Sequence, residues 1–79
     1  MAKRKFSSDD LARCCEAARF VRVLEAWDRV EFEHPSVPGR IAVPLHEKDF
    51  PPGALRSIEK HIAKAVGEDV TIASMLKYV

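Results

Sequence analysis

The chain has few cysteines, and the two that it has are adjacent. Cys14 and Cys15 suit neither a disulfide framework nor a zinc site, because no second pair is present to complete four ligands. No spacing of Asp, Glu and His residues resembles a metal site either. We therefore expect reduced thiols and no metal or other cofactor. Neighbouring side chains on a helix point about 100° apart, so we expect one thiol in the core and the other at its margin.

Long apolar runs and a large net charge are also missing. No apolar stretch approaches the length of a membrane span, and the basic residues 3–5 are not followed by the apolar segment of a secretory signal. We therefore expect a cytoplasmic protein without a membrane partner. The formal net charge is +1, whereas dedicated nucleic-acid-binding proteins usually have a strongly basic surface. Any RNA binding would have to depend on local basic patches.

The first part of the chain changes from a helical to a strand pattern. Residues 7–10 supply hydroxyl and carboxylate groups that can cap a helix. Apolar side chains then recur at helical spacing, at Leu11, Cys14, Cys15 and Ala18. Residues 20–24 and 30–34 are instead rich in β-favouring residues, and apolar and charged side chains alternate in the second of these stretches. This pattern predicts one helix followed by a hairpin with one solvated face.

The second part predicts a turn, a third strand and two more helices. Residues 35–39 contain two prolines and a glycine and favour a turn, and residues 40–45 favour a strand. A helix is expected from Pro52 to Val66, with Gly67 closing it. Asp69 or Thr71 can cap a third helix, whose apolar stripe consists of Ile72, Met75, Leu76 and Val79. That stripe is expected to pack on its own sheet, with a homo-oligomer through this C-terminal helix as the alternative.

These elements predict one α+β domain over residues 1–79, with a flexible basic lead-in at residues 1–6. A three-stranded antiparallel sheet covered by helices on one face is the economical arrangement. A core of this size is only marginally sufficient by itself, so a partner or self-association would not be surprising.

Residues 39–60 also resemble a known family. A strand ends in Val43, Pro44 and His46, and after a short loop a helix begins at Pro52 and Gly53 and continues with the run at residues 55–58, Leu-Arg-Ser-Ile. This segment resembles the C-terminal half of the HicA (YcfA-like) toxin family. The resemblance implies an α-β-β-β-α domain similar to a double-stranded-RNA-binding fold, to which this chain adds a C-terminal helix. It also implies a domain that cuts mRNA and is inhibited by a HicB-like antitoxin protein.

The family's glycine-serine-histidine motif falls on Trp27, Asp28 and Arg29, because the resemblance extends without gaps from Arg19 to Pro35. The family histidine is taken to activate the ribose 2′-hydroxyl. Arginine remains protonated at neutral pH and cannot replace it as a base. The family's arginine-glutamine-lysine run is replaced by residues 24–26, Leu-Glu-Ala. The resemblance therefore predicts a divergent member that lacks the usual catalytic histidine.

His46 matches the family's second histidine and is the candidate catalytic residue, because histidine has an unperturbed pKa near neutral pH. The alternative is a histidine that only anchors its loop. His34, before Pro35, is expected to be structural, and His61 is expected at the margin of the core.

Five basic residues are candidates for RNA contacts: Arg29, Arg40, Lys48, Arg56 and Lys60. Arg56, Lys60 and Lys64 are spaced to form a stripe along one helix face, and Arg40 and Lys48 are expected near it, together with the phosphate-favouring N–H groups of the helix start. A merely solvated face is the alternative.

Three hypotheses follow from these patterns. The first, which we prefer, is a HicA-like RNA-binding domain without efficient RNase activity. The second is an active but divergent mRNA endonuclease that uses His46. The third is an interaction module that binds a HicB-like antitoxin or another protein.

Overall fold

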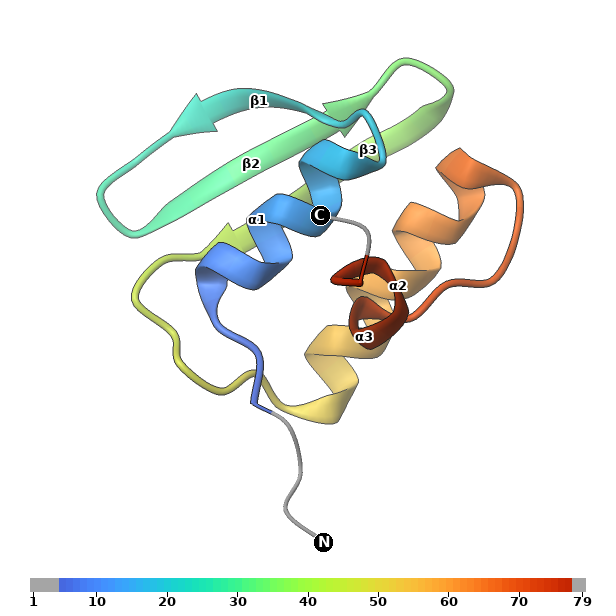
Figure 1. Cartoon of the computed structure of the whole chain (residues 1–79). Helices are drawn as coiled ribbons and strands as arrows, with labels where there is room; N and C mark the ends of the chain where they lie inside the picture. The colour runs from blue at the N-terminus through green and yellow to red at the C-terminus, as the bar shows by residue number, and fades with distance from the viewer. Residues whose placement is uncertain (1–4, 78–79) are drawn as a thin grey trace, which may run out of the picture.

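The computed structural model describes residues 5–77 and has the expected α+β architecture. A helix is followed by three antiparallel strands and then by further helices (Figure 1). In chain order the elements are α1 (Ser8–Ala17), β1 (Val21–Glu25), β2 (Arg29–His34), β3 (Val37–Pro44), α2 (Pro52–Val66) and α3 (Ile72–Met75). The strands lie in the order β1-β2-β3, so β1 and β3 are the two edges of the sheet.

Helix α1 begins where the capping residues predicted it. The Ser7 hydroxyl accepts a hydrogen bond from the Asp10 N–H, and the Asp10 carboxylate accepts one from the Ser7 N–H. Both Cys14 and Cys15 are fully buried, so the expectation of one marginal thiol is wrong. The reason is that α1 contacts β3 and also α3, which encloses more than one side of the helix. Burial raises the pKa of the Cys15 thiol to about 12, which makes it unreactive.

The sheet has one apolar and one solvated face, as the alternation predicted. Val30 and Phe32 of β2 pair with Val43 and Ile41 of β3, and all four side chains are buried beneath the helices. The helices lie on this inner side of the sheet (Figure 1). No described residue forms a helix on the other side, so the outer face is open to solvent.

Strand β3 begins earlier than expected, at Val37, and the turn is confined to residues 35–36. Val37 pairs with His34, so the turn signal of Pro38 and Gly39 was misleading. A proline is tolerated here because β3 is an edge strand. Gly39 has a φ of 89°, and the register shifts nearby, between Phe32 and His34.

Helix α2 has the predicted bounds, and Gly67 closes it with a φ of 82° and a 2.8 Å hydrogen bond from its N–H to the Ala63 carbonyl. Thr71, rather than Asp69, caps α3. Helix α3 is much shorter than the predicted stripe, and Val79 lies outside the described residues. Ile72 is buried in the monomer's own core, which agrees with intramolecular packing.

The N-terminal segment 1–6 was predicted to be flexible, but its last residue, Phe6, is held in the core. Residues 1–4 lie outside the described part, but Phe6 is buried in the core and its carbonyl accepts a hydrogen bond from the Phe50 N–H. Its ring therefore helps to close the core beside the loop that precedes α2. Within residues 5–77, no helix is long and apolar enough to cross a membrane.

Candidate functional site

Arg29 lies at the start of β2, on the outer face of the sheet, and carboxylates surround its guanidinium. Its Nε donates a 2.7 Å hydrogen bond to Glu31, and its Nη1 donates a 3.1 Å bond to Asp28. These contacts raise the pKa of Arg29, with the hydrogen bond to Glu31 as the main cause. Arg29 therefore stays protonated, and its charge is largely compensated before any ligand arrives.

Arg40 is bound in the same way on β3. It donates to Glu31 at 3.1 Å through Nη1 and to Glu33 through Nε. Glu31 lies between Arg29 and Arg40, which lower the pKa of its carboxyl by hydrogen bonding. Asp28, Arg29, Glu31, Arg40 and Glu33 thus form an outer charge row, in which three carboxylates face two guanidiniums. This row offers no excess positive charge to a phosphate.

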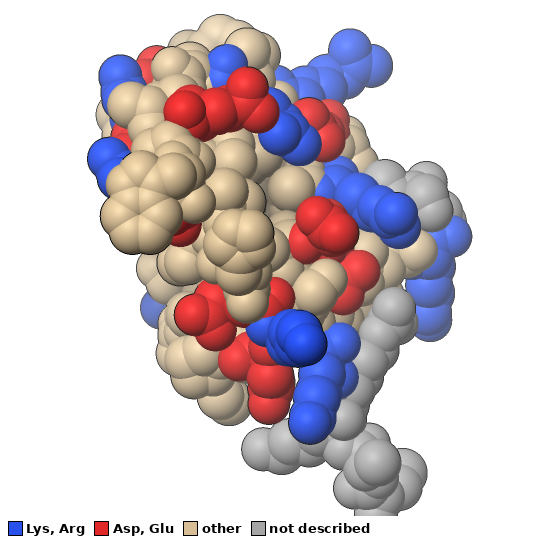
Figure 2. All heavy atoms as spheres, turned by 90° about the vertical axis from the view of Figure 1, so that its left-hand side faces the viewer, with Lys and Arg blue, Asp and Glu red and all other residues tan. Residues whose placement is uncertain are grey.

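Exposed apolar side chains accompany the outer charge row. Trp27, in the β1–β2 turn, is 87% exposed, and Val21 and Val23 of β1 are also exposed. Val21 lies opposite Glu33 in the register, next to the charge row. The side of the molecule that carries this turn shows positive and negative side chains intermixed, with uncharged surface between them and no large area of one sign (Figure 2).

His46 lies in the turn that follows β3, and its backbone is held on both sides by Ser8. The Ser8 hydroxyl donates to the Pro44 carbonyl and accepts from the Glu47 N–H at 3.0 Å, and the Ser8 N–H donates to the Glu47 carbonyl at 3.0 Å. Ser8 is buried. Sequence reasoning missed this role because it assigned residues 7–10 to capping alone.

His46 has a φ of 67°, a left-handed conformation that is uncommon for residues other than glycine. Its side chain is exposed. The Leu45 N–H donates to the Asp28 carbonyl at 2.9 Å, so His46 and Arg29 lie at the same end of the sheet. No hydrogen bond within residues 5–77 orients the His46 imidazole. A general base normally has such an orienting group.

The basic stripe of α2 lies on a different surface. Arg56, Lys60 and Lys64 are exposed and line a cavity of about 480 Å³ beside residues 67–70. None of the three forms an ion pair within the described part of the chain. Arg40, which we expected near this stripe, lines another cavity on the opposite side of α2, and Lys48 is exposed in the preceding loop. The predicted RNA contacts are thus divided among sheet, loop and helix.

That other cavity, of about 430 Å³, lies between β3 and α2 and was not predicted. His61 of α2 lines it, and its Nε2 atom is buried without a hydrogen-bond partner. Burial, with a contribution from Lys64, lowers the pKa of His61. His34 is structural, as expected, because its Nδ1 accepts from the Ser36 N–H at 3.0 Å and its ring packs 5.1 Å from that of Phe20. No local sequence pattern signalled this cavity, because its lining comes from two separate elements, β3 and α2.

Residues 5–77 contain no group of three or more His, Cys, Asp or Glu side chains placed to bind a metal ion. Comparison with protein-family models and with curated proteins gives no match to this chain. The resemblance to HicA toxins therefore stays a prediction that depends on the residues quoted above.

Proposed function

We propose that this chain is a HicA-like domain of the toxin–antitoxin type, related to double-stranded-RNA-binding folds, that does not cleave RNA efficiently and contacts a protein partner instead. One observation carries this proposal: Arg29, at the position of the family's catalytic histidine, is held by Glu31 and Asp28. A guanidinium bound by two carboxylates neither accepts a proton nor attracts a phosphate strongly.

The outer face around Arg29 favours a protein over RNA as its partner. The outer charge row is compensated internally, and the exposed Trp27, Val21 and Val23 lie beside it. Exposed aromatic side chains often supply the central contacts of protein interfaces. A HicB-like antitoxin is the partner that the resemblance implies.

Cleavage of a labelled single-stranded RNA tests the loss of RNase activity. We expect no efficient cleavage by the wild type, because loss of a positioned base typically costs about 10²- to 10⁴-fold in rate. Arg29→His alone should not restore it, since Trp27 and Asp28 still occupy the family's glycine and serine positions. Replacing residues 25–29 with glutamine, lysine, glycine, serine and histidine should cleave faster than the single variant.

His46→Ala is the matched control for these reactions, because His46 is the remaining candidate base. Robust cleavage by the wild type that disappears in His46→Ala would show that the chain is an active divergent endonuclease. Full activity from Arg29→His alone would also contradict the proposal, because it would mean that the surrounding surface still positions RNA.

RNA binding without cleavage is a second candidate function, favoured by the unpaired basic stripe of Arg56, Lys60 and Lys64. We expect modest affinity that falls with salt, with a logarithmic slope of about 0.7 for each phosphate bound on a single strand. Arg56→Glu or Lys60→Glu should each reduce that slope by about 0.7, measured by fluorescence anisotropy over a salt series.

Arg13→Glu is the control for this series, because Arg13 is an exposed arginine on α1 and its reversal changes the net charge equally. Equal effects of Arg13→Glu and Arg56→Glu would indicate attraction by net charge only. Unchanged binding after reversal of Arg56 and Lys60 would rule out the helix stripe as the RNA-binding surface.

A further inference from the structure

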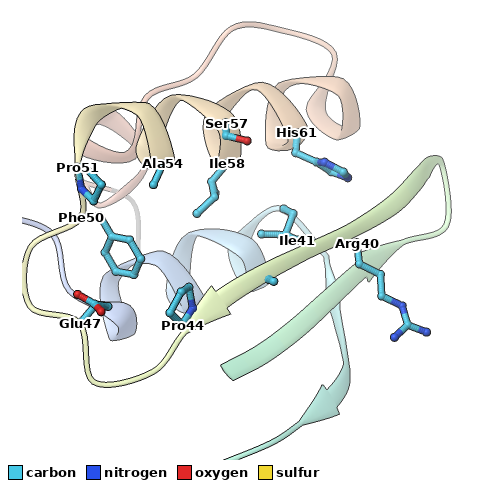
Figure 3. A pocket seen from close by; sticks show the side chains of 11 residues that line it. Arg40, Ile41, Pro44, Glu47, Phe50, Pro51, Ala54, Ser57, Ile58 and His61 are labelled. Atoms are coloured by element: carbon cyan, nitrogen blue, oxygen red, sulfur yellow. The ribbon is translucent and has the colours of Figure 1, made fainter. Parts of the chain in front are cut away.

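A groove runs between the free edge of β3 and helix α2. The cavity of about 430 Å³ is lined on one side by residues 40–42 and Pro44 of β3, and on the other by Ala54, Ser57, Ile58 and His61 of α2. Phe50 and Pro51 close one end (Figure 3). Its volume falls in the range of about 300–1,000 Å³ that is typical of ligand sites. We refer to it as the β3–α2 groove.

The β3 edge of this groove carries main-chain groups without partners. Leu45, directly after β3, donates its N–H to the carbonyl of Asp28, directly before β2. The Arg29 carbonyl accepts from the Ala26 N–H at 2.8 Å, so it points away from β3. Hydrogen-bonded positions alternate along antiparallel strands, so β3 residues 41 and 43 bond to β2 whereas Ala42 directs its N–H and C=O away from it. No hydrogen bond from the described residues reaches the Ala42 main chain from the side of α2.

Only a short part of this edge is available. The next outward-directed position is Pro44, which has no N–H and whose carbonyl already accepts a hydrogen bond from Ser8. Residues 39–43 therefore offer roughly 16 Å of strand at about 3.3 Å per residue. An edge of this length matches a partner segment of about five residues.

The helix side supplies a second unsatisfied polar group. The Nε2 atom of His61 is the buried side-chain polar atom that has no partner among residues 5–77. The His61 ring extends from α2 toward β3 (Figure 3). It lies beside Gly39, since a Cβ atom added to that glycine would be 3.5 Å from the His61 Cε1 atom. Unpaired buried polar atoms are costly, so a ligand that donates to or accepts from Nε2 would remove that cost.

We propose that the β3–α2 groove binds an extended segment of a partner protein, which pairs with β3 as a fourth strand. Its main chain exchanges hydrogen bonds with Ala42, and alternate apolar side chains enter the cavity between Ile58 and Phe50. Strand addition beside a helix is an established mode of peptide recognition, in which the main chain gives affinity and the alternate side chains give specificity. The site deepens the proposed function, because it depends on that function's protein partner and adds the place where the partner's segment docks.

The test uses the full chain and a fluorescein-labelled peptide selected against it from a phage-displayed library of random octapeptides. Methylating one peptide nitrogen at a time removes one main-chain donor. We expect the affinity to fall about tenfold when the nitrogen that bonds to the Ala42 carbonyl is methylated and little at the positions beside it, as the loss of a single hydrogen bond requires. The readout is fluorescence anisotropy.

Two variants of α2 test the location. Ser57→Trp should fill the groove and lower the affinity for the peptide at least about tenfold, as expected when a well-packed contact is lost. Val66→Trp should leave binding unchanged, because Val66 is an exposed residue on the other side of the same helix and does not line the groove. Thermal melting by circular dichroism checks that both variants fold, and the methylation series needs no variant.

Each of several results would overturn the proposal. They are a library that yields no binder, equal binding to Ser57→Trp and wild type, and a methylation series in which no position lowers the affinity more than its neighbours. A dimer in gel filtration that Ser57→Trp dissociates would show that a second copy occupies the groove instead. Robust RNA cleavage with normal peptide binding would defeat only the proposed function. Absent cleavage with peptide binding unaffected by Ser57→Trp would defeat only the groove.

Discussion

Phe32→Ala is expected to lower the free energy of unfolding by about 3–5 kcal/mol, the usual range for removing a buried phenylalanine ring. Phe32 lies on the middle strand of the sheet and is fully buried. A chain of this length typically has a free energy of unfolding of about 4–12 kcal/mol. The loss is therefore at least about a quarter of that free energy of unfolding, and urea denaturation followed by far-UV circular dichroism would measure the change.

Val21→Ala is the control for this experiment, because Val21 lies on the same sheet but is 59% exposed. Its effect should stay within about 0.5 kcal/mol, as for most surface substitutions. Similar urea midpoints for Phe32→Ala and Val21→Ala would contradict the assignment of the inner and outer faces of the sheet. The outer charge row depends on that same assignment.

Ser8→Ala is expected to lower the free energy of unfolding by about 2–6 kcal/mol, because it leaves two main-chain groups without a partner and each such loss costs about 1–3 kcal/mol. These groups are the Pro44 carbonyl and the Glu47 N–H, which lie on either side of His46. Chemical denaturation gives the stability change, and amide hydrogen exchange at Glu47 reports the loop directly.

Ser7→Ala is the matched control, because Ser7 caps the same helix without contacting the His46 loop. Loss of an N-cap typically costs about 1 kcal/mol. We expect faster exchange of the Glu47 amide in Ser8→Ala than in Ser7→Ala. Equal exchange in the two variants would mean that Ser8 does not hold the loop that carries His46.

The sequence by itself determined the start of α1, the end of α2 and the number of strands. Ser7 and Asp10 form the expected cap of α1, and Gly67 closes α2. Capping and left-handed closure involve residues within one turn of each other, so local sequence specifies them. The alternation around Val30 and Phe32 likewise predicted which face of β2 is buried. These features do not depend on how distant segments pack.

The sequence was less informative where the outcome depended on distant neighbours. Both cysteines are buried because α1 contacts β3 and α3 together, and the start of β3 at Val37 depends on its pairing with His34. Ser8 meets Pro44 and Glu47 across more than thirty residues of chain. Propensity and periodicity describe single helices and strands, and they do not say which of these elements contact each other in the fold. These contacts were therefore not predictable.

Only the tertiary structure decided the character of the candidate sites. The sequence identified Arg29 and Arg40 as cations but not their partners, because Glu31 reaches both only in the observed register of β2 and β3. A register shift of one residue would have placed that carboxylate on the other face of the sheet. The β3–α2 groove likewise exists because α2 stands away from the free edge of β3, leaving Ala42 and His61 without partners. Long-range packing sets that separation, and no local pattern encodes it.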